Sequence, residues 1–248
     1  MNNRLTLGLA LLMAVASAGF AQDNRALEQD LSSRYIGKSF DTAQPYLNRE
    51  VWYGQDGNIT VRFAPDRLLV TPRGLPKADL APEDLVEVDL QGRHLHGSRK
   101  ASTELDLHLR IYRAREDCGA VVHAHPPTAT AFAVAGEGIP ADVLPEVAVL
   151  MGEVPVVPYA TTGTPALGDA VEPFLAGCDA VLLANHGAVA WGATLAVARI
   201  RMESLEHAAR ILMAARSLGR VIRLTPDQMH DLERLRGKSR HGQTDLGT

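Results

Sequence analysis

The chain has 248 residues, of which 46% are hydrophobic and 22% are charged, as expected for a globular domain with a sizeable core. Its formal net charge is −4 at pH 7 and no run of lysine or arginine stands out, so we expect no nucleic-acid partner. The glycine-rich signatures of dinucleotide-binding and P-loop proteins are also missing from the sequence. We therefore expect one domain, residues 22–236, that acts on a small molecule.

The amino terminus has the pattern of a secretory signal, residues 1–21. Arg4 supplies the positive charge, residues 5–18 are apolar, and Gly19-Phe20-Ala21 resembles a cleavage site. A buried helix or a misassigned start would give the same pattern. The first interpretation predicts an exported, periplasmic protein with no membrane attachment in its mature form, and the second a cytoplasmic one. Residues 237–248 are polar and are expected to form a flexible tail.

The first half of the chain reads as strands followed by one helix. Residues 59–63 and 67–71 have strand character and are separated by a short turn, which predicts a hairpin, and residues 85–90 alternate as a third strand. A helix follows, with Ser102 or Thr103 as its expected N-cap. Helix amino termini also attract anions, so these two hydroxyls are either a plain cap or part of an anion site.

The second half alternates between strands and helices. This alternation predicts a layered α/β sandwich, and the turns of the first half favour a mixed or antiparallel sheet. The expected strands are 120–125, 154–158, 180–184 and 187–191, and the expected helices are 128–135, 165–175, 195–218 and one beginning at residue 225.

Three histidines lie at strand ends. His123 and His125 are two residues apart on a strand, so both rings project from the same face, and the prolines that follow end that strand. A second apolar strand ends at His186. Such histidines are often surface or packing residues, but three together would form an open catalytic metal site.

The two cysteines lie just before the histidine-bearing strands. Cys118 and Cys178 would be able to form a disulfide if the strands are neighbours and the protein is exported. The alternative is a pair of buried free thiols.

Glu104 is the best candidate for an acid or base near these histidines. It lies at the predicted helix start, where a glutamate is also favoured simply by the helix dipole. A divalent ion that stabilises an enediolate, with a carboxylate to move the proton, would cleave or form a carbon–carbon bond beside a ketone. A Schiff base would instead need a buried lysine, and all four lysines, Lys38, Lys77, Lys100 and Lys238, lie in polar or loop-like sequence.

Residues 51–220 resemble the class II aldolase/adducin family, and within it most resemble the L-fuculose-phosphate aldolases. The motifs that carry the resemblance are Gly57-Asn58-Ile59-Thr60-Val61-Arg62, Thr71-Pro72-Arg73-Gly74, Ser102-Thr103-Glu104, the run from Ala120 to His125, Pro158-Tyr159-Ala160-Thr161-Thr162-Gly163-Thr164 and Asn185-His186-Gly187.

The resemblance implies a three-layer α/β/α sandwich with a mixed, largely antiparallel sheet, usually assembled as a homotetramer. It implies Zn²⁺, or another divalent metal such as Mn²⁺, Co²⁺ or Fe²⁺, on His123, His125 and His186. Glu104 matches the acid/base, which also ligates the metal in the absence of substrate. The positions that match the phosphate site are Asn58, Gly74, Ser102 and Thr103.

The sequence departs from the family pattern at three places. Arg73 replaces a residue that is often threonine, so it is a further candidate for binding the anion, which is then a phosphate or a carboxylate. A second acid/base tyrosine has no clear match, and Glu146 is the candidate replacement. Export is unusual for an enzyme that acts on phosphorylated sugars.

Together these features predict a zinc-dependent aldehyde-lyase for a small hydroxy-ketone or hydroxy-acid that we expect to be phosphorylated, such as a ketose 1-phosphate. The alternatives within the family are a pentulose-phosphate 4-epimerase, a dehydratase and a decarboxylase. An adducin-like, non-catalytic interaction module is the alternative from another class, and it predicts loss of the metal ligands.

Overall fold

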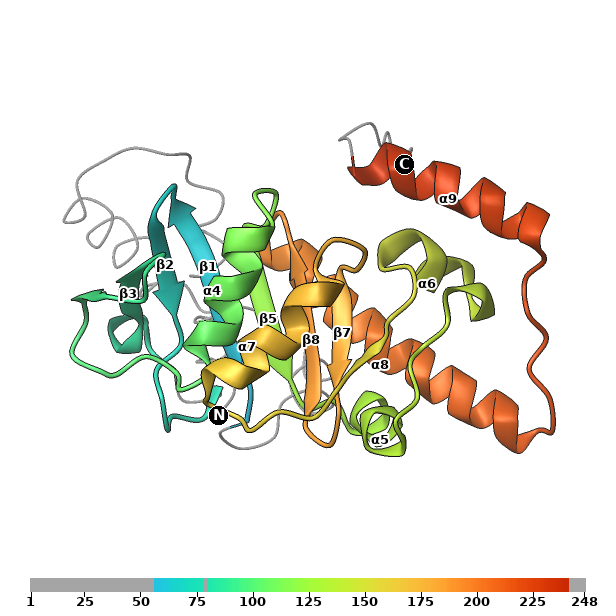
Figure 1. Ribbon diagram of the computed structural model, residues 1–248, viewed down its shortest axis with the longest axis horizontal. Helices are drawn as coiled ribbons and strands as arrows, with labels where there is room; N and C mark the ends of the chain where they lie inside the picture. Colours follow the sequence, from blue (N-terminus) through green and yellow to red (C-terminus); the bar gives the residue numbers. More distant parts are fainter. Residues whose placement is uncertain (1–55, 78–79, 241–248) are drawn as a thin grey trace, which may run out of the picture.

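A central sheet of eight strands organises the computed structural model, which describes residues 56–77 and 80–240 (Figure 1). The expected signal segment, residues 1–21, lies outside the described residues. The strands follow the order β4-β3-β2-β1-β5-β8-β7-β6, and all neighbours are antiparallel except β6 and β7. Their bounds are β1 (Asn58–Ala64), β2 (Arg67–Val70), β3 (Val86–Asp89), β4 (His94–His96), β5 (Ala120–Ala124), β6 (Val156–Val157), β7 (Ala180–Leu183) and β8 (Gly187–Gly192).

The predicted hairpin is present as β1 and β2, which pair antiparallel. The short edge strand β4 was not predicted from the sequence, because its segment is exposed and polar and has no apolar alternation. The mixed, largely antiparallel sheet is confirmed.

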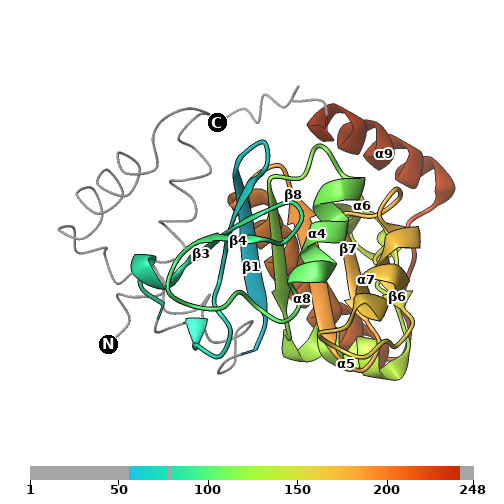
Figure 2. The same cartoon turned by 60° about the vertical axis from the view of Figure 1, so that its left-hand side comes forward.

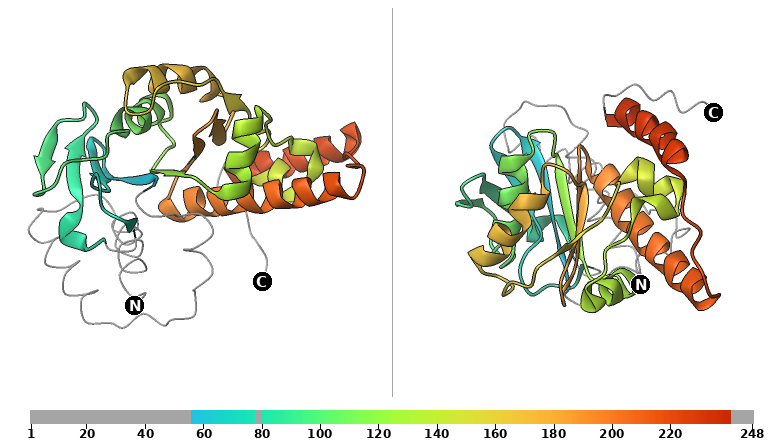
Figure 3. Two further views of the ribbon diagram at one scale, coloured as in Figure 1. Left: turned by 90° about the horizontal axis from the view of Figure 1, so that it is seen from below. Right: turned by 45° about the vertical axis from the view of Figure 1, so that its right-hand side comes forward.

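Helices cover both faces of the sheet, as the left view in Figure 3 shows. One face packs against α4 (Leu105–Ala114) and α7 (Pro165–Val171), and the other against α5 (Pro127–Ala135), α6 (Pro145–Leu150) and α8 (Leu195–Ser217). Short 3₁₀ turns lie at Pro82–Asp84, Ala141–Val143 and Glu172–Phe174. The three-layer α/β/α arrangement is therefore confirmed.

Strand alternation supplies two hydrophobic cores. On β5, Val121 faces the α4 layer while Val122 faces the α8 layer, and on β8 Val189 and Ala190 divide in the same way. Because side chains alternate at every residue, these fully buried strands read as continuous apolar runs.

The helix that carries Glu104 begins later than the sequence suggested. Its first residue is Leu105, and Glu104 occupies the N-cap position without a side-chain cap hydrogen bond. The Ser102 hydroxyl accepts a hydrogen bond from the Glu104 amide at 3.3 Å. The expected N-cap at Ser102 or Thr103 is therefore wrong, because a local turn over residues 102–104 precedes the first helical turn.

The last helix, α9 (Pro226–Arg240), packs against α6 and continues into the stretch expected to be a tail (Figure 2). No helix within the described part of the chain is both long and apolar enough to cross a membrane. Both cysteines are free thiols, and Cys118 donates a weak hydrogen bond to the Ala120 carbonyl at 3.4 Å.

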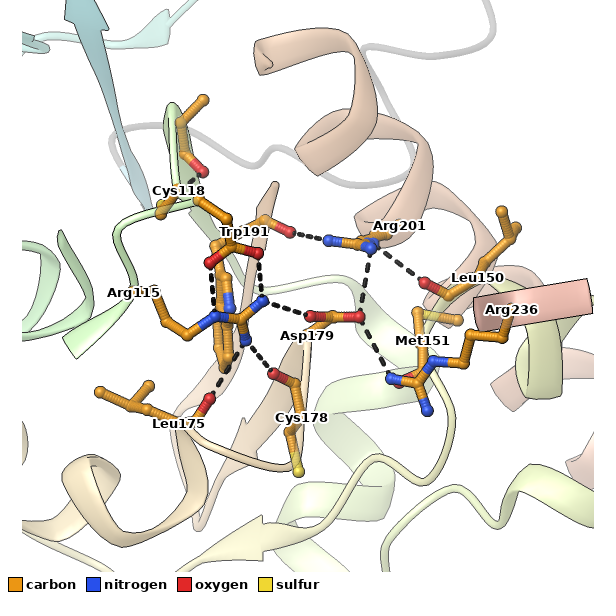
Figure 4. Close-up of polar contacts among 12 residues, drawn as sticks. Arg115, Cys118, Leu150, Met151, Leu175, Cys178, Asp179, Trp191, Arg201 and Arg236 are labelled. Carbon is orange, nitrogen blue, oxygen red and sulfur yellow. Dashed lines mark hydrogen bonds and ion pairs between the residues drawn. The ribbon is translucent and has the colours of Figure 1, made fainter. Parts of the chain in front are cut away.

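A buried carboxylate joins α8 and α9 to the sheet (Figure 4). Asp179, at the start of β7, is fully buried and pairs with Arg115 at 3.0 Å and with Arg201 and Arg236 at 3.1 Å each. The guanidinium groups also donate to backbone carbonyls, among them Met151 O, which satisfies donors that the short carboxylate cannot reach. This cluster fixes the end of β7 that lies away from His186.

Candidate metal centre

The three histidines meet at one edge of the sheet. β5 and β7 are both antiparallel to β8, which lies between them, so their carboxyl ends lie at the same edge. His123 and His125 lie at the end of β5, and His186 lies in the turn from β7 to β8. Their ligand nitrogens all lie within 4.8 Å of one another, and their ring centroids are 4.7 to 5.0 Å apart.

Hydrogen bonding orients His123 for a metal. Its Nδ1 donates to the Ala188 carbonyl at 2.9 Å, which leaves Nε2 as the free nitrogen of the neutral ring. The Nε2 atoms of His123 and His125 are only 3.2 Å apart. Two lone pairs at this distance repel, so the pair requires a shared proton or a cation. A divalent cation therefore fits the donor set.

The turn that carries His186 depends on two unusual backbone positions. Asn185 has a φ of 57°, the only positive φ of a non-glycine residue among the residues described. At Gly187, an added Cβ would lie 2.5 Å from Cδ2 of His125 and 2.6 Å from the Ala124 carbonyl oxygen. Only glycine lets the hairpin approach β5 closely enough to bring His186 beside His125.

Glu104, at the N-cap of α4, places its carboxylate beside the three histidines. Its Oε2 lies 3.3 Å from Nε2 of His123, its Oε1 lies 3.4 Å from Nε2 of His186, and Asn58 donates to Oε2 at 2.8 Å. The register of β1 and β5 places Asn58 directly opposite His123, which explains how the amide reaches the carboxylate. Within the described residues Oε1 is buried without a hydrogen-bond partner, as expected of an atom kept for a metal or a substrate proton.

Burial and the neighbouring groups keep Glu104 ionised and favour the neutral forms of His125 and His186. Burial alone raises the pKa of the Glu104 carboxyl, but the hydrogen bond and charge of His123, the charge of His186 and the Asn58 hydrogen bond together lower it well below its ordinary value. Burial first, and the charge of His123 second, lower the pKa values of His125 and His186 to about 4. Neutral imidazoles and an ionised carboxylate are the forms that bind metal.

The predicted anion-binding residues lie on two adjoining loops. Pro72 and Ala101 form an isolated bridge, and the Arg73 amide donates to the Lys100 carbonyl at 2.9 Å, so the loop after β2 lies beside the residues before α4. Of the four predicted loop residues, Arg73, Gly74 and Thr103 are exposed and Ser102 is half-buried. Their role in binding a phosphate stays a prediction.

Glu146 lies elsewhere. It is exposed in the first turn of α6, and within the described part of the structure no hydrogen bond or ion pair joins it to the three histidines. Its assignment as a second acid/base stays a prediction.

Lys77 is the residue that sequence reasoning missed. It follows the Gly74 loop and is only 5% exposed, so its loop-like sequence concealed a buried lysine. Burial lowers the pKa of Lys77 to about 8, and the charges of Asp56 and Glu104 act against that shift. A lysine three residues after a glycine turn carries no local signal of burial, because burial arises from packing against distant segments.

Three imidazoles and a carboxylate around one point are the donor set of a divalent-metal site with room for a substrate. Residues 42–213 match the Class II Aldolase and Adducin N-terminal domain. The chain belongs to the class II aldolase and adducin family.

Known relatives catalyse two different reactions. The chain is 38% identical over 180 residues to the 5-deoxy-D-ribulose 1-phosphate aldolase of Bacillus thuringiensis, covering 72% of this chain and 84% of that protein. It is 36% identical over 199 residues to the 3-oxo-tetronate 4-phosphate decarboxylase of Pectobacterium atrosepticum, covering 77% and 90%. The solved structure of an L-fuculose 1-phosphate aldolase superposes with a TM-score of 0.68 at 32% identity, covering 73% and 85%.

Proposed function

We propose that this protein is a metal-dependent carbon–carbon lyase that cleaves a small phosphorylated hydroxy-ketone by a retro-aldol reaction. The observation that carries the proposal is the Glu104 carboxylate. It lies between two candidate ligand histidines, and one of its oxygens accepts no hydrogen bond from residues 56–77 or 80–240. This arrangement places a base beside the point where a substrate carbonyl and hydroxyl would meet a metal.

In this proposal the histidines bind the metal and Glu104 transfers the proton. His123, His125 and His186 would hold a divalent ion, and its Lewis acidity would polarise the substrate carbonyl and stabilise the negative charge left by cleavage. Glu104 accepts a proton from the substrate or returns one to the carbon that loses its partner. Asn58 holds Oε2 of Glu104, so Oε1 is the oxygen that handles the proton.

The phosphate is assigned to the two loops beside Glu104. Exposed backbone at Gly74, the hydroxyls of Ser102 and Thr103 and the Arg73 guanidinium offer donors on neighbouring loops. Anions are favoured at such clusters of amides and hydroxyls before a helix. Binding there would leave the far end of the substrate near the histidines.

Decarboxylation is the second candidate. It breaks a carbon–carbon bond next to a carbonyl and leaves the same kind of anion, with carbon dioxide in place of an aldehyde. Similarity over 90% of the length of a decarboxylase supports it, and Arg73 suits a carboxylate as well as a phosphate.

Two further proposals concern assembly and location: a homotetramer, which the family resemblance implies, and export directed by the signal-like residues 1–21. Light scattering on the purified protein tests the first. Amino-terminal sequencing of the protein recovered from the producing cells tests the second, and an intact residue 1 on cytoplasmic protein would contradict export.

Elemental mass spectrometry and product analysis test the main proposal. We expect one divalent metal per chain and release of an aldehyde from 5-deoxyribulose 1-phosphate, or of carbon dioxide from 3-oxo-tetronate 4-phosphate. The Glu104→Gln variant keeps the shape of the side chain and should lose turnover by about 100-fold or more. Wild-type rates in this variant, or a metal-free and inactive wild type, would contradict the proposal.

A further inference from the structure

The helix that begins two residues after His125 has no N-cap side chain of its own. The N-cap residue of α5 is Pro126, which offers no side-chain acceptor, and Pro127 is the first helical residue. Proline has no amide hydrogen, so the amides of Thr128 and Ala129 are the first donors without a partner inside the helix. Both residues are buried, so their amides need an acceptor from another part of the chain.

Glu206 of α8 supplies that acceptor. Its side chain is only 3% exposed, and its Oε2 accepts hydrogen bonds from the amides of Thr128 at 3.0 Å and Ala129 at 2.8 Å. The Thr128 amide also lies 3.2 Å from Oε1, and Arg210, one turn further along α8, donates to Oε1 at 2.8 Å. A carboxylate is favoured in this place because the amino terminus of a helix carries partial positive charge. The start of α5 is therefore fixed to α8.

The capped end of α5 is joined stiffly to His125. On one side of His125 lies Ala124, which pairs with Ala188 of β8. On the other side lies Pro126, whose ring fixes its own φ and restricts the backbone of the residue before it. A shift of the start of α5 would thus move His125, because few free torsions lie between them to absorb the change.

The other end of the same helix contacts the turn that carries His186. The Asn185 amide donates to the Ala133 carbonyl, in the last turn of α5, at 3.4 Å. Asn185 directly precedes His186 and has the positive φ of 57° that shapes the turn. The placement of α5 therefore bears on the backbone beside two of the three histidines, whereas His123 is oriented by its bond to the Ala188 carbonyl.

We propose that Glu206 is a positioning residue of the candidate metal centre, which sets the places of His125 and His186 by capping α5. Its hydrogen bonds within residues 56–77 and 80–240 go to the α5 amides and to Arg210, so it acts through the helix. The inference rests on the proposed function for the three histidines as metal ligands, and it is independent of which reaction the protein catalyses.

Metal affinity of the full chain, measured for Zn²⁺ by competition with a chromophoric chelator, tests this role. Glu206→Ala leaves the two α5 amides without an acceptor and should weaken Zn²⁺ binding about 10-fold, a typical loss when the support of a metal ligand is removed. Glu206→Gln keeps an acceptor oxygen at the same reach and should retain most of the affinity. Glu206→Asp withdraws the carboxylate by one methylene and should lose much of it. The contrast between the last two variants decides the question even if Glu206→Ala does not fold.

A second measurement separates a change in geometry from a loss of stability. The visible absorption of Co²⁺ bound in place of Zn²⁺ reports the coordination geometry. It should change in Glu206→Ala and Glu206→Asp and stay as in the wild type in Glu206→Gln. Glu203→Ala is the matched control, because Glu203 lies on the same helix and forms the same kind of i,i+4 ion pair, with Arg199 at 3.0 Å. It should leave both the affinity and the spectrum unchanged.

Three results would overturn the inference. Lower stability with wild-type metal affinity and spectrum in Glu206→Ala and Glu206→Asp would mean that Glu206 only stabilises the fold. An equal loss of affinity in Glu203→Ala would mean that the effect is not specific to the cap. A loss in Glu206→Gln with none in Glu206→Asp would mean that the charge, and not the reach to the α5 amides, is what matters.

Turnover separates this inference from the proposed function. A wild type whose metal affinity depends on Glu206, but which cleaves neither phosphorylated substrate, would contradict the proposed lyase and support the positioning role. A wild type that releases aldehyde from 5-deoxyribulose 1-phosphate, with unchanged metal affinity in Glu206→Ala, would support the lyase and refute the positioning role.

Discussion

Replacing Asp179 should destabilise the protein by weakening the attachment of α8 and α9 to the sheet. The carboxylate is fully buried, and three guanidinium groups lie 3.0 to 3.1 Å from its oxygens. In Asp179→Asn these arginines lose their shared counter-ion while their side chains remain 13%, 14% and 19% exposed. Removing one partner of a buried ion pair costs about 3–5 kcal/mol, and we expect a loss of this size in the free energy of unfolding.

Urea unfolding followed by circular dichroism measures this loss, with the slope of the transition checked for constancy. Asp117→Asn is the control, because Asp117 pairs with the same Arg115 but is largely exposed, so its replacement should cost less than about 1 kcal/mol. If Asp179→Asn came within about 1 kcal/mol of the wild type, the three arginines would not depend on this carboxylate and the reasoning would be refuted.

Three further predictions concern the site and its surroundings. Gly187→Ala should displace His125 and reduce metal content, whereas Gly177→Ala, where an added Cβ meets nothing within 4 Å, should not. His186→Ala should release the metal in dialysis with little change in fold, and full metal retention would contradict its assignment as a ligand. Burial, with a smaller contribution from the charge of His123, lowers the pKa of His108 from 6.5 to about 3. The neutral folded form therefore contributes stability above pH 6.5 that is lost as the pH falls toward 3, at about 1.4 kcal/mol per pH unit. His125 and His186, whose pKa values are also lowered, add to the pH dependence of the wild type. Urea unfolding at about pH 7, 6 and 5 should therefore show a slope that is smaller in His108→Gln than in the wild type by up to about 1.4 kcal/mol per pH unit.

Local patterns were sufficient for most of the fold. The β1–β2 hairpin, the strand before His123 and the long helix α8 follow from turn residues and apolar periodicity, which act within a few residues. The spacing of His123 and His125 likewise places both rings on one face, because strand residues two apart project in the same direction. The sequence did not predict the edge strand β4, because that strand is exposed and lacks apolar alternation. It also placed the start of α4 too early, because a turn that the capping rule does not describe precedes the helix.

Sequence alone determined which chemistry the chain carries: three strand-end histidines, a glutamate at a helix start and the motif order of one family. Tertiary structure decided how these groups act on one another. Register across β1 and β5 brings Asn58 to the Glu104 carboxylate, and packing between distant segments buries Lys77 and Asp179. Burial and ion pairing depend on segments far apart in the chain. No local sequence pattern therefore predicts that Lys77 is buried or that Asp179 pairs with three arginines.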